Sequence, residues 1–331
     1  VRAKFWKCES LKLLGRYKQA LTEAMEAVSK KYTAANPRDL FNIYTNIIAL
    51  GLSLPTSLES IHRSLKQAEQ FARQNGRPHW HSKLLLLRSN VLRNRGMYSE
   101  ALDRVQEAWA KYQAIYPIYA MDTYMKNIAR LLINMKRFDD AEKFFTYWDN
   151  QPNDQPGRRL RRKTLREIQL ARARGNKEKY VNLARAFSQR HSSLYDSYHF
   201  IQVQIIAGHF DSIKDLLAKY LYQERKSESL YKQNFLWRLI GDFHHNKARK
   251  MLGLQTVDCR YEGEKTVSIP EIPEKIHKKA LHELKRAEKA YKNANSYANQ
   301  IDEKLKATVN SELCHELLAK NRHIINNIAV K

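Results

Sequence analysis

A repeated pattern of large and small apolar residues is the feature that most constrains how this chain can fold. Each copy has apolar residues one helical turn apart, then a tight turn that is often Gly-x-aromatic, and then a second apolar segment. Apolar residues three and four apart share one face of a helix, and small residues there let a partner helix approach closely. The residues that open the second segments are spaced 41, 40, 40, 39 and 33 apart, at Ala20, Ile61, Ala101, Ala141, Tyr180 and Ile213. The pattern therefore predicts one helical hairpin repeated about six times.

The clearest copy occupies residues 85–108, where Leu92 precedes the turn Gly96-Met97-Tyr98 and Ala101 follows it. A glycine at this place suits the left-handed residue that commonly ends a helix. A single hairpin cannot bury its apolar stripe, so neighbouring hairpins must stack. With only 10 Gly and 8 Pro in 331 residues, a loop-rich β-sandwich is excluded. We expect an all-α protein.

The pattern resembles the tetratricopeptide repeat family. The resemblance covers about residues 1–294 and is strongest at 80–150. It is carried by Ser89, Leu92, Gly96, Tyr98 and Ala101, by Ile128, Ala129, Leu132, Phe138 and Ala141, and by Trp237-Arg238-Leu239-Ile240-Gly241, which is similar to the family's Trp-x-x-Leu-Gly signature. The chain departs from the family at Arg88, where an apolar residue is expected, and in its longer step, since the family repeats every ~34 residues. The resemblance implies a right-handed α-solenoid of about six hairpins with longer helices.

We expect four segments along the chain. They are a helical-repeat region at 1–251, an insert at 252–273, the second helix of the sixth hairpin at 274–295, and a C-terminal helix at 296–331. Solenoids need an end cap, so the last helix is interpreted either as that cap or as a connector to a further domain.

The insert at 252–273 has the alternation of a β-hairpin. Val257–Tyr261 and Lys265–Ile269 alternate apolar and polar residues around Glu262-Gly263-Glu264, and Pro270 and Pro273 end the pattern. The sequence therefore predicts a small β-hairpin within the sixth helical hairpin.

No catalytic or cofactor-binding motif is present. The chain lacks a phosphate-binding Gly-rich loop, a Gly-x-Ser-x-Gly turn and a His-Glu-x-x-His helix. His244 and His245 would point about 100° apart on a helix, and so could not share one metal ion. We therefore expect a protein that is not an enzyme and that needs no cofactor and no metal.

Cysteine use and hydropathy indicate a setting for the chain. Cys8, Cys259 and Cys314 are far apart and lack Cys-x-x-Cys spacing, which favours a reducing, cytoplasmic environment. No apolar run reaches ~18 residues, so no membrane-spanning helix is expected.

Charge is the strongest signal that the fold does not explain. The chain has 59 Lys and Arg against 34 Asp and Glu, a net charge of +25. Residues 158–190 alone hold twelve basic residues against Glu167 and Glu178. A basic patch is predicted at Arg158, Arg159, Arg161, Arg162, Lys163 and Arg166. One interpretation is a charged surface that keeps the protein soluble, and the other is an anionic partner.

The family resemblance implies where such a partner binds, because first helices line the concave groove of tetratricopeptide repeats. The residues that project onto that face are Lys83, Asn90, Arg93, Lys126, Asn127, Arg130, Arg162, Gln169, Arg172, Tyr198 and Gln202. The Lys and Asn on adjacent first helices are similar to the carboxylate clamp of chaperone-binding members, although the full five-residue set is not matched.

The leading hypothesis is a protein-interaction scaffold whose basic groove binds an acidic peptide or protein surface. One alternative is an RNA- or other nucleic-acid-binding helical-repeat protein that uses the same Arg-rich stripe. Another is the sensor or regulatory region of a larger bacterial-type enzyme or transcription regulator. The sequence leaves the partner's identity and the oligomeric state open.

Overall fold

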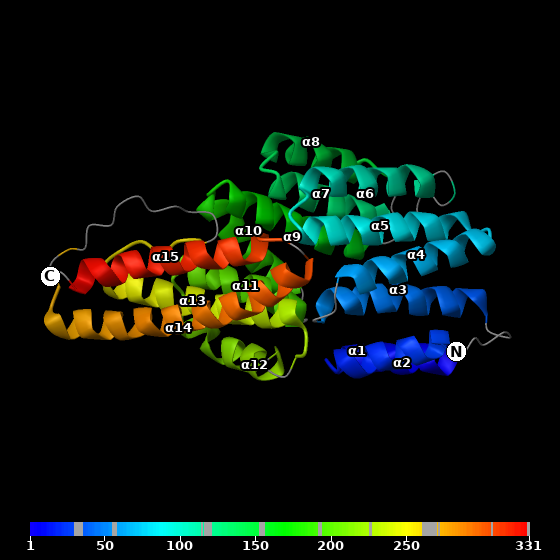
Figure 1. Ribbon diagram of the computed structural model, residues 1–331. Coiled ribbons are helices and arrows are strands. Elements are labelled where there is room, and N and C mark those ends of the chain that lie inside the picture. Colours follow the sequence, from blue (N-terminus) through cyan, green and yellow to red (C-terminus); the bar gives the residue numbers. More distant parts are fainter. Residues whose placement is uncertain are drawn as a thin grey trace. The chain divides into compact units, whose positions relative to one another are not determined.

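A computed structural model describes residues 1–29, 36–54, 58–113, 115, 121–151, 156–190, 194–224, 227–259, 270, 272–305 and 307–329. These residues form two compact units. Unit 1 contains Val1–Arg162, Lys226–Tyr231 and Gln300–Val309, and unit 2 contains Lys163–Arg225, Lys232–Asn299 and Asn310–Lys331. All regular secondary structure in the described ranges is helical (Figure 1). Within those ranges, no helix has a stretch long and apolar enough to cross a bilayer.

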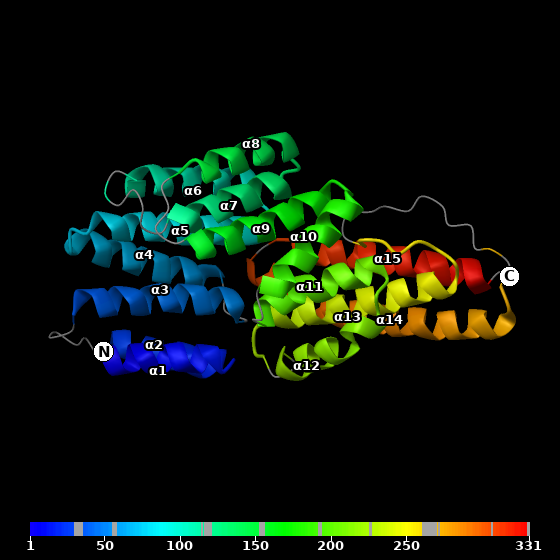
Figure 2. The same cartoon turned by 180° about the vertical axis from the view of Figure 1, so that it is seen from behind.

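Unit 1 is a series of helices in which each packs against the next along the chain (Figures 1 and 2). Alternate helices also meet, α1 with α3 and α3 with α5, so that first helices lie beside first helices. The series consists of α1 (Arg2–Leu13), α2 (Tyr17–Ser29), α3 (Pro37–Ser53), α4 (Leu58–Gln74), α5 (Pro78–Asn94), α6 (Tyr98–Gln113), α7 (Met121–Asn134) and α8 (Phe138–Asp149).

Helix α9 (Pro156–Ala173) begins in unit 1 and continues in unit 2. The other helices of unit 2 are α10 (Lys177–Arg190), α11 (Leu194–Ala207), the short 3₁₀ turn η1 (Asp211–Ile213), α12 (Lys214–Glu224), and most of α13 (Leu230–Met251), α14 (Glu274–Leu305) and α15 (Val309–Ala329). Asn321 of α15 joins the last three, because its Oδ1 accepts from His245 Nδ1 of α13 (2.9 Å) and its Nδ2 donates to the carbonyl of Leu284 of α14 (3.0 Å).

The predicted repeat register is confirmed. The residues that open the second segments, Ala20, Ile61, Ala101, Ala141, Tyr180 and Ile213, are all buried, with 0–1% of their surface exposed. The first five lie one turn inside α2, α4, α6, α8 and α10, and the sixth ends η1. The small and apolar residues therefore mark the packing positions of an all-α repeat made of helical hairpins, which is tetratricopeptide-like at this coarse level.

Most turns inside the hairpins are closed by the same backbone hydrogen bond. Five of them share a backbone bond from one residue to the carbonyl five before it, for example from Met97 N to Leu92 O at 3.0 Å and from Arg137 N to Leu132 O at 2.9 Å. This bond requires a left-handed residue just before the donor, and Gly96 has φ 81° there. Lys136 occupies the same place in the fourth hairpin with φ 59°. The Gly-x-aromatic turn is thus a helix C-cap, as the sequence predicts.

An aromatic stack fixes α5 against its neighbours in unit 1. The rings of Phe41 (α3) and Trp80 (α5) are 4.3 Å apart and nearly parallel, and Phe71 (α4) lies 5.8 Å from Trp80 on a similar plane. Stacked rings of this size contribute large buried apolar area and allow few alternative orientations. The stack therefore sets the rotation of α5, which carries residues of both sites discussed below.

Two expectations for the last third of the chain differ from the structure. The single helix expected at 296–331 is instead divided, because α14 continues to Leu305 and α15 begins at Val309. Apolar periodicity runs through both helices, and no Gly or Pro marks the break, so the sequence pattern hides it. The predicted β-hairpin is not supported: residues 254–258 have neither helix nor strand, and 260–269 lie outside the described residues.

Candidate functional site: the first-helix face of unit 1

Charge differs between the first and second helices of the third and fourth hairpins of unit 1, α5/α6 and α7/α8. Helices α5 and α7 carry five Lys and Arg and one carboxylate, Asp122. The second helices α6 and α8 carry three basic residues, Arg104, Lys111 and Lys143, against seven carboxylates, at Glu100, Asp103, Glu107, Asp139, Asp140, Glu142 and Asp149. The single carboxylate of α7 is itself paired, since Arg159 Nε lies 3.1 Å from Asp122 Oδ1. The first helices therefore present excess positive charge.

The polar residues of these helices share a surface that we call the first-helix face, made of Asn42, Lys83, Asn90, Arg93, Lys126 and Arg130. Lys83 Nζ of α5 lies 3.3 Å from Asn42 Oδ1 of α3, which links the two adjacent first helices. About two and three turns further along α5, Arg93 Nη1 donates to Asn90 Oδ1 at 2.8 Å. Lys83, Asn90, Lys126 and Arg130 are all partly exposed.

Two features of the surroundings bear on Lys83. Its ammonium lies 5.5 Å from the centre of the Phe41 ring, within the range of a cation–π contact. Burial lowers the pKa of Lys83, and the nearby positive charge of Lys12 acts in the same direction. Bringing a carboxylate to this position would relieve both effects, because an opposite charge favours the protonated amine.

On α7 the predicted residues divide into exposed and buried ones. Asn127 is buried, and its Nδ2 donates to the carbonyl of Thr123 at 2.7 Å. The hydroxyl of Thr123 accepts from Arg162 Nη1 of α9 at 3.0 Å, so α7 and the start of α9 are joined on this side. Asn127 thus acts within the helix, and Lys126 and Arg130 remain the side chains of α7 that a partner can reach.

Part of the first-helix face adjoins residues from late in the chain. Tyr231 of unit 1 lies close enough to Arg93, Arg130 and Asp302 for all three to affect its pKa. Burial raises the pKa of Tyr231, Asp302 raises it further, and the two guanidinium groups oppose both. The Arg93 and Arg130 end of the face is therefore next to a buried phenol and a buried carboxylate of the same unit.

Lys304 ties the end of α14 to α3 within unit 1. Its Nζ donates to the carbonyls of Gly51, Leu52 and Leu54 at 2.5–2.8 Å. These carbonyls belong to the C-terminal end of α3, where helices lack internal partners and the dipole favours a cation. Burial lowers the pKa of Lys304 to about 7.

The predicted basic patch does not form one surface. Arg159 is buried: its Nη1 donates to the carbonyl of Gln151 at 2.6 Å, and its Nε reaches Asp122, which also accepts from Trp148 Nε1 at 2.9 Å. Arg161 and Arg162 are partly exposed in unit 1. Lys163 pairs with Glu167 at 3.4 Å in unit 2, and the side chain of Arg158 lies outside the described residues.

The predicted residues of unit 2 are engaged with one another. Arg166 Nη1 donates to Gln169 Oε1 at 2.5 Å. Arg172 is buried, and it donates from Nε to Asp258 and from Nη1 to Gln202, both at 2.6 Å. These groups hold α9 and α11 in unit 2 together, and buried guanidinium groups of this kind cannot also bind an exposed peptide.

Tyr198, the last predicted residue of unit 2, packs into the apolar cluster around Ile201 and Leu236, and its ring meets Phe235 edge-on at 5.9 Å. It therefore fills the core. The other predicted residues of unit 2 are likewise buried or hydrogen-bonded within that unit, and the candidate site is therefore sought on unit 1.

Comparison with known proteins adds one finding. A solved structure described as a Rap protein complexed with competence and sporulation factor is similar over 98% of this chain and 98% of that chain, with 11% sequence identity and a TM-score of 0.44. No family model and no curated protein matches the chain. The function is accordingly argued from the residues of the chain itself.

Proposed function

We propose that this chain is a non-enzymatic helical-repeat protein that binds an acidic peptide or an acidic segment of a partner protein on the first-helix face of unit 1. The observation that carries the proposal is the charge difference within the third and fourth hairpins: carboxylates outnumber basic residues on α6 and α8, while α5 and α7 present Lys, Arg and Asn. Ordinary solubility is served by mixing both signs over the surface, so segregation favours a partner of opposite charge.

Binding follows from the chemistry of that face. The ammonium groups of Lys83 and Lys126 attract carboxylates, and the amide of Asn90 can donate to a carboxylate or a backbone carbonyl of the ligand. The helices that carry these groups are held by the Trp80 stack and by the capped turns, so little ordering is needed on binding.

The nucleic-acid alternative draws on the charge of residues 158–190, and the structure gives it less support. Arg159, Arg166 and Arg172 of that region are buried and hydrogen-bonded inside the protein. A phosphate backbone is bound by a row of accessible basic side chains. The regulatory alternative remains compatible with the same peptide-binding face.

Reversing the charge of Lys83 and Lys126 together is expected to weaken binding of an acidic decapeptide, such as a fluorescein-labelled (Asp-Glu)5, by about 10–30-fold at low salt, since each exposed charge contact is worth ~1 kcal/mol. Fluorescence anisotropy of K83E/K126E against the unmodified protein measures the change. K126E alone is expected to weaken binding about three- to fivefold. This variant leaves the contact between Lys83 and Phe41 intact.

Lys143 provides the matched control. Lys143 is an exposed lysine on α8, which is a second helix. K143E therefore changes the net charge of the protein by the same amount as K126E but leaves the first-helix face intact. We expect K143E to weaken the peptide less than twofold. If K143E is as harmful as K126E, only net charge matters and the proposed face is wrong. Tighter retention of a 12-nucleotide oligouridine than of the peptide at physiological salt would favour the nucleic-acid alternative instead.

A further inference from the structure

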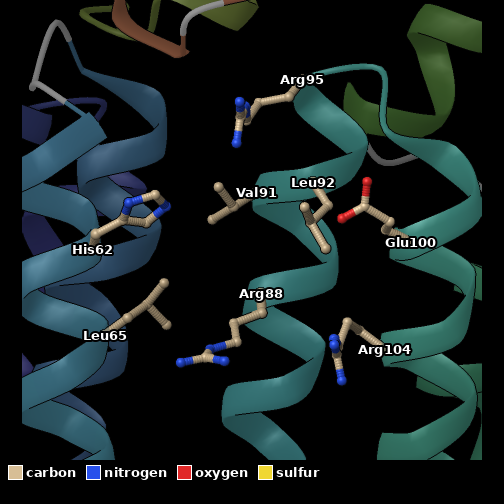
Figure 3. Close-up of a pocket in the computed structure, with 8 residues that line it drawn as sticks. All are labelled: His62, Leu65, Arg88, Val91, Leu92, Arg95, Glu100 and Arg104. Carbon is tan, nitrogen blue, oxygen red and sulfur yellow. The ribbon is translucent and has the colours of Figure 1, made fainter.

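Unit 1 contains a pocket of about 350 Å³ between α4, α5 and α6. It is lined by His62 and Leu65 of α4, by Arg88, Val91, Leu92 and Arg95 of α5 and its C-cap, and by Glu100 and Arg104 of α6; we call it the basic pocket (Figure 3). Its volume lies within the range of sites for small ligands.

The basic pocket is separate from the first-helix face. Successive helix residues are about 100° apart, which places Arg88, Leu92 and Arg95 on the side of α5 opposite to Lys83 and Asn90. Its basic residues also have no counterpart in the repeat pattern, because Arg88 stands where the tetratricopeptide family has an apolar residue. The proposed peptide-binding function therefore leaves this pocket unexplained.

Arginines lie at both ends of the basic pocket, with Arg95 above Val91 and Leu92 and with Arg88 and Arg104 below them (Figure 3). Arg88 and Arg95 extend from α5 towards α4, while Glu100 and Arg104 approach from α6 (Figure 3). Two of the arginines have neighbouring carboxylates: Arg88 Nη2 lies 2.7 Å from Glu69, and Arg104 Nη1 lies 2.8 Å from Glu107.

Arg95 differs from the other two arginines. Its Nε is buried, and among the described residues it has no hydrogen-bond partner. A buried donor without an acceptor costs roughly 1–3 kcal/mol, more when it is charged. That nitrogen is closed to solvent, so an oxyanion in the basic pocket would meet the outer guanidinium nitrogens of Arg95, whose forked geometry suits carboxylate or phosphate oxygens.

The floor of the basic pocket is apolar. Leu65 and Val91 are buried, and Leu92 is partly exposed beside them. A bare anion would leave this surface wet, whereas a short branched hydrocarbon attached to the anion would cover it. The pocket thus combines arginines from α5 and α6 with an apolar lining.

We propose that the basic pocket binds a small organic oxyanion, a carboxylate or phosphate carried on a short branched aliphatic body, with the anionic head at Arg95 and the body on Leu65, Val91 and Leu92. This is a second site, on the opposite side of α5 from the first-helix face. Ligand binding in the basic pocket does not depend on peptide binding at that face.

The probe is 4-methylpentanoate, which joins a carboxylate to a leucine-like body, with neutral 4-methylpentanamide and inorganic phosphate as comparisons. The full chain labelled with ¹⁵N is titrated while the Nε–Hε signal of Arg95 is followed, assigned through its loss in R95Q. We expect saturable shifts of that signal with a Kd of ~1 mM, an ordinary value for an acid of about eight heavy atoms. Amide and phosphate are each expected to bind at least about tenfold more weakly.

Substitutions of single arginines test whether the ligand binds in the basic pocket. R104Q changes an exposed α6 side chain of the basic pocket and is expected to raise Kd about threefold or more, as read from backbone signals around Val91. R95Q is expected to raise it at least about tenfold. Arg63 is the matched control, because it is exposed on α4 beside His62 without lining the pocket, and R63Q should leave Kd unchanged.

Three results would overturn the inference: no saturable shift up to 20-fold above the expected Kd, equal binding of acid and amide, or equal effects of R95Q and R63Q. Circular dichroism melting of each variant shows whether it is folded. If R95Q does not fold, R104Q against R63Q decides the question, because both residues are exposed.

Discussion

Replacing Gly241 by alanine is expected to destabilise the protein by about 3 kcal/mol, which is large for the addition of one methyl group. Gly241 lies on α13 directly beneath the ring of Tyr291 on α14. A Cβ built at this glycine would lie 2.8 Å from Tyr291 Cζ and closer still to two other ring carbons. Real Cβ atoms do not approach a ring so closely, so either the ring or the helix must move.

Either movement would cost free energy of folding. Tyr291 is only 1% exposed, and its hydroxyl donates to Asp242 Oδ1 at 2.8 Å. Burial raises the pKa of Asp242 to about 6, while the bond from Tyr291 works against that rise, so displacing the ring would also remove a stabilising contact of a buried acid. The added methyl therefore breaks both packing and a hydrogen bond at the α13–α14 contact in unit 2.

Urea unfolding followed by circular dichroism measures the effect. Gly157, on α9, is the matched control: nothing lies within 4 Å of a Cβ added there, and its φ is not left-handed. G157A is expected to leave stability unchanged or to raise it by up to ~1 kcal/mol, as alanine does in helices generally. An unchanged unfolding midpoint for G241A would mean that α13 and α14 do not pack as described.

The part of the fold that was predictable is the part encoded by near neighbours in sequence. Small residues at Ala101 and Ala141 mark close helix approaches, and Gly96 marks a left-handed cap, so hairpin register could be read from spacing alone. Gly241 belongs to the same class, because it was identified as the small residue of a family signature. The structure adds the physical reason, which is the ring of Tyr291.

Contacts between distant segments were not predictable. Lys304 caps α3 across 250 residues or more of sequence, and nothing in its local pattern distinguishes it from an exposed lysine. The break between α14 and α15 was hidden for a related reason. It lacks Gly and Pro, and the apolar spacing of one long helix also fits two helices that both face the same core.

The candidate site was predicted in part for the same reason. Helical spacing places Lys83, Asn90 and Arg93 on one side of α5, and a hydrogen bond joins the last two. Spacing gave no means to tell an exposed arginine from a buried one, so Arg159 and Arg172 were assigned to surfaces that they do not occupy. Their carboxylate partners, Asp122 and Asp258, lie 37 and 86 residues away.

The second large effect concerns one of those buried arginines. Replacing Arg172 by methionine is expected to destabilise the protein by about 3–5 kcal/mol, because it leaves the buried carboxylate of Asp258 without its counter-charge. The side chains of Arg172 and Asp258 are 6% and 3% exposed, and their Nε–Oδ2 distance is 2.6 Å. Gln202 also loses its contact with Arg172 Nη1. Urea unfolding of R172M measures the loss, and R174M at the exposed neighbour Arg174 should cost no more than ~0.5 kcal/mol.

A double-mutant cycle separates the ion pair from simple packing. In R172M/D258N the uncompensated charge is gone, so the double variant is expected to be more stable than R172M by about 1–3 kcal/mol. If Arg172 were instead an accessible peptide-binding residue, R172M would unfold like the unmodified chain and would weaken the acidic decapeptide as K126E does. Unaltered stability together with weakened peptide binding would therefore return Arg172 to the binding surface and remove the assignment of the predicted unit 2 residues to internal packing.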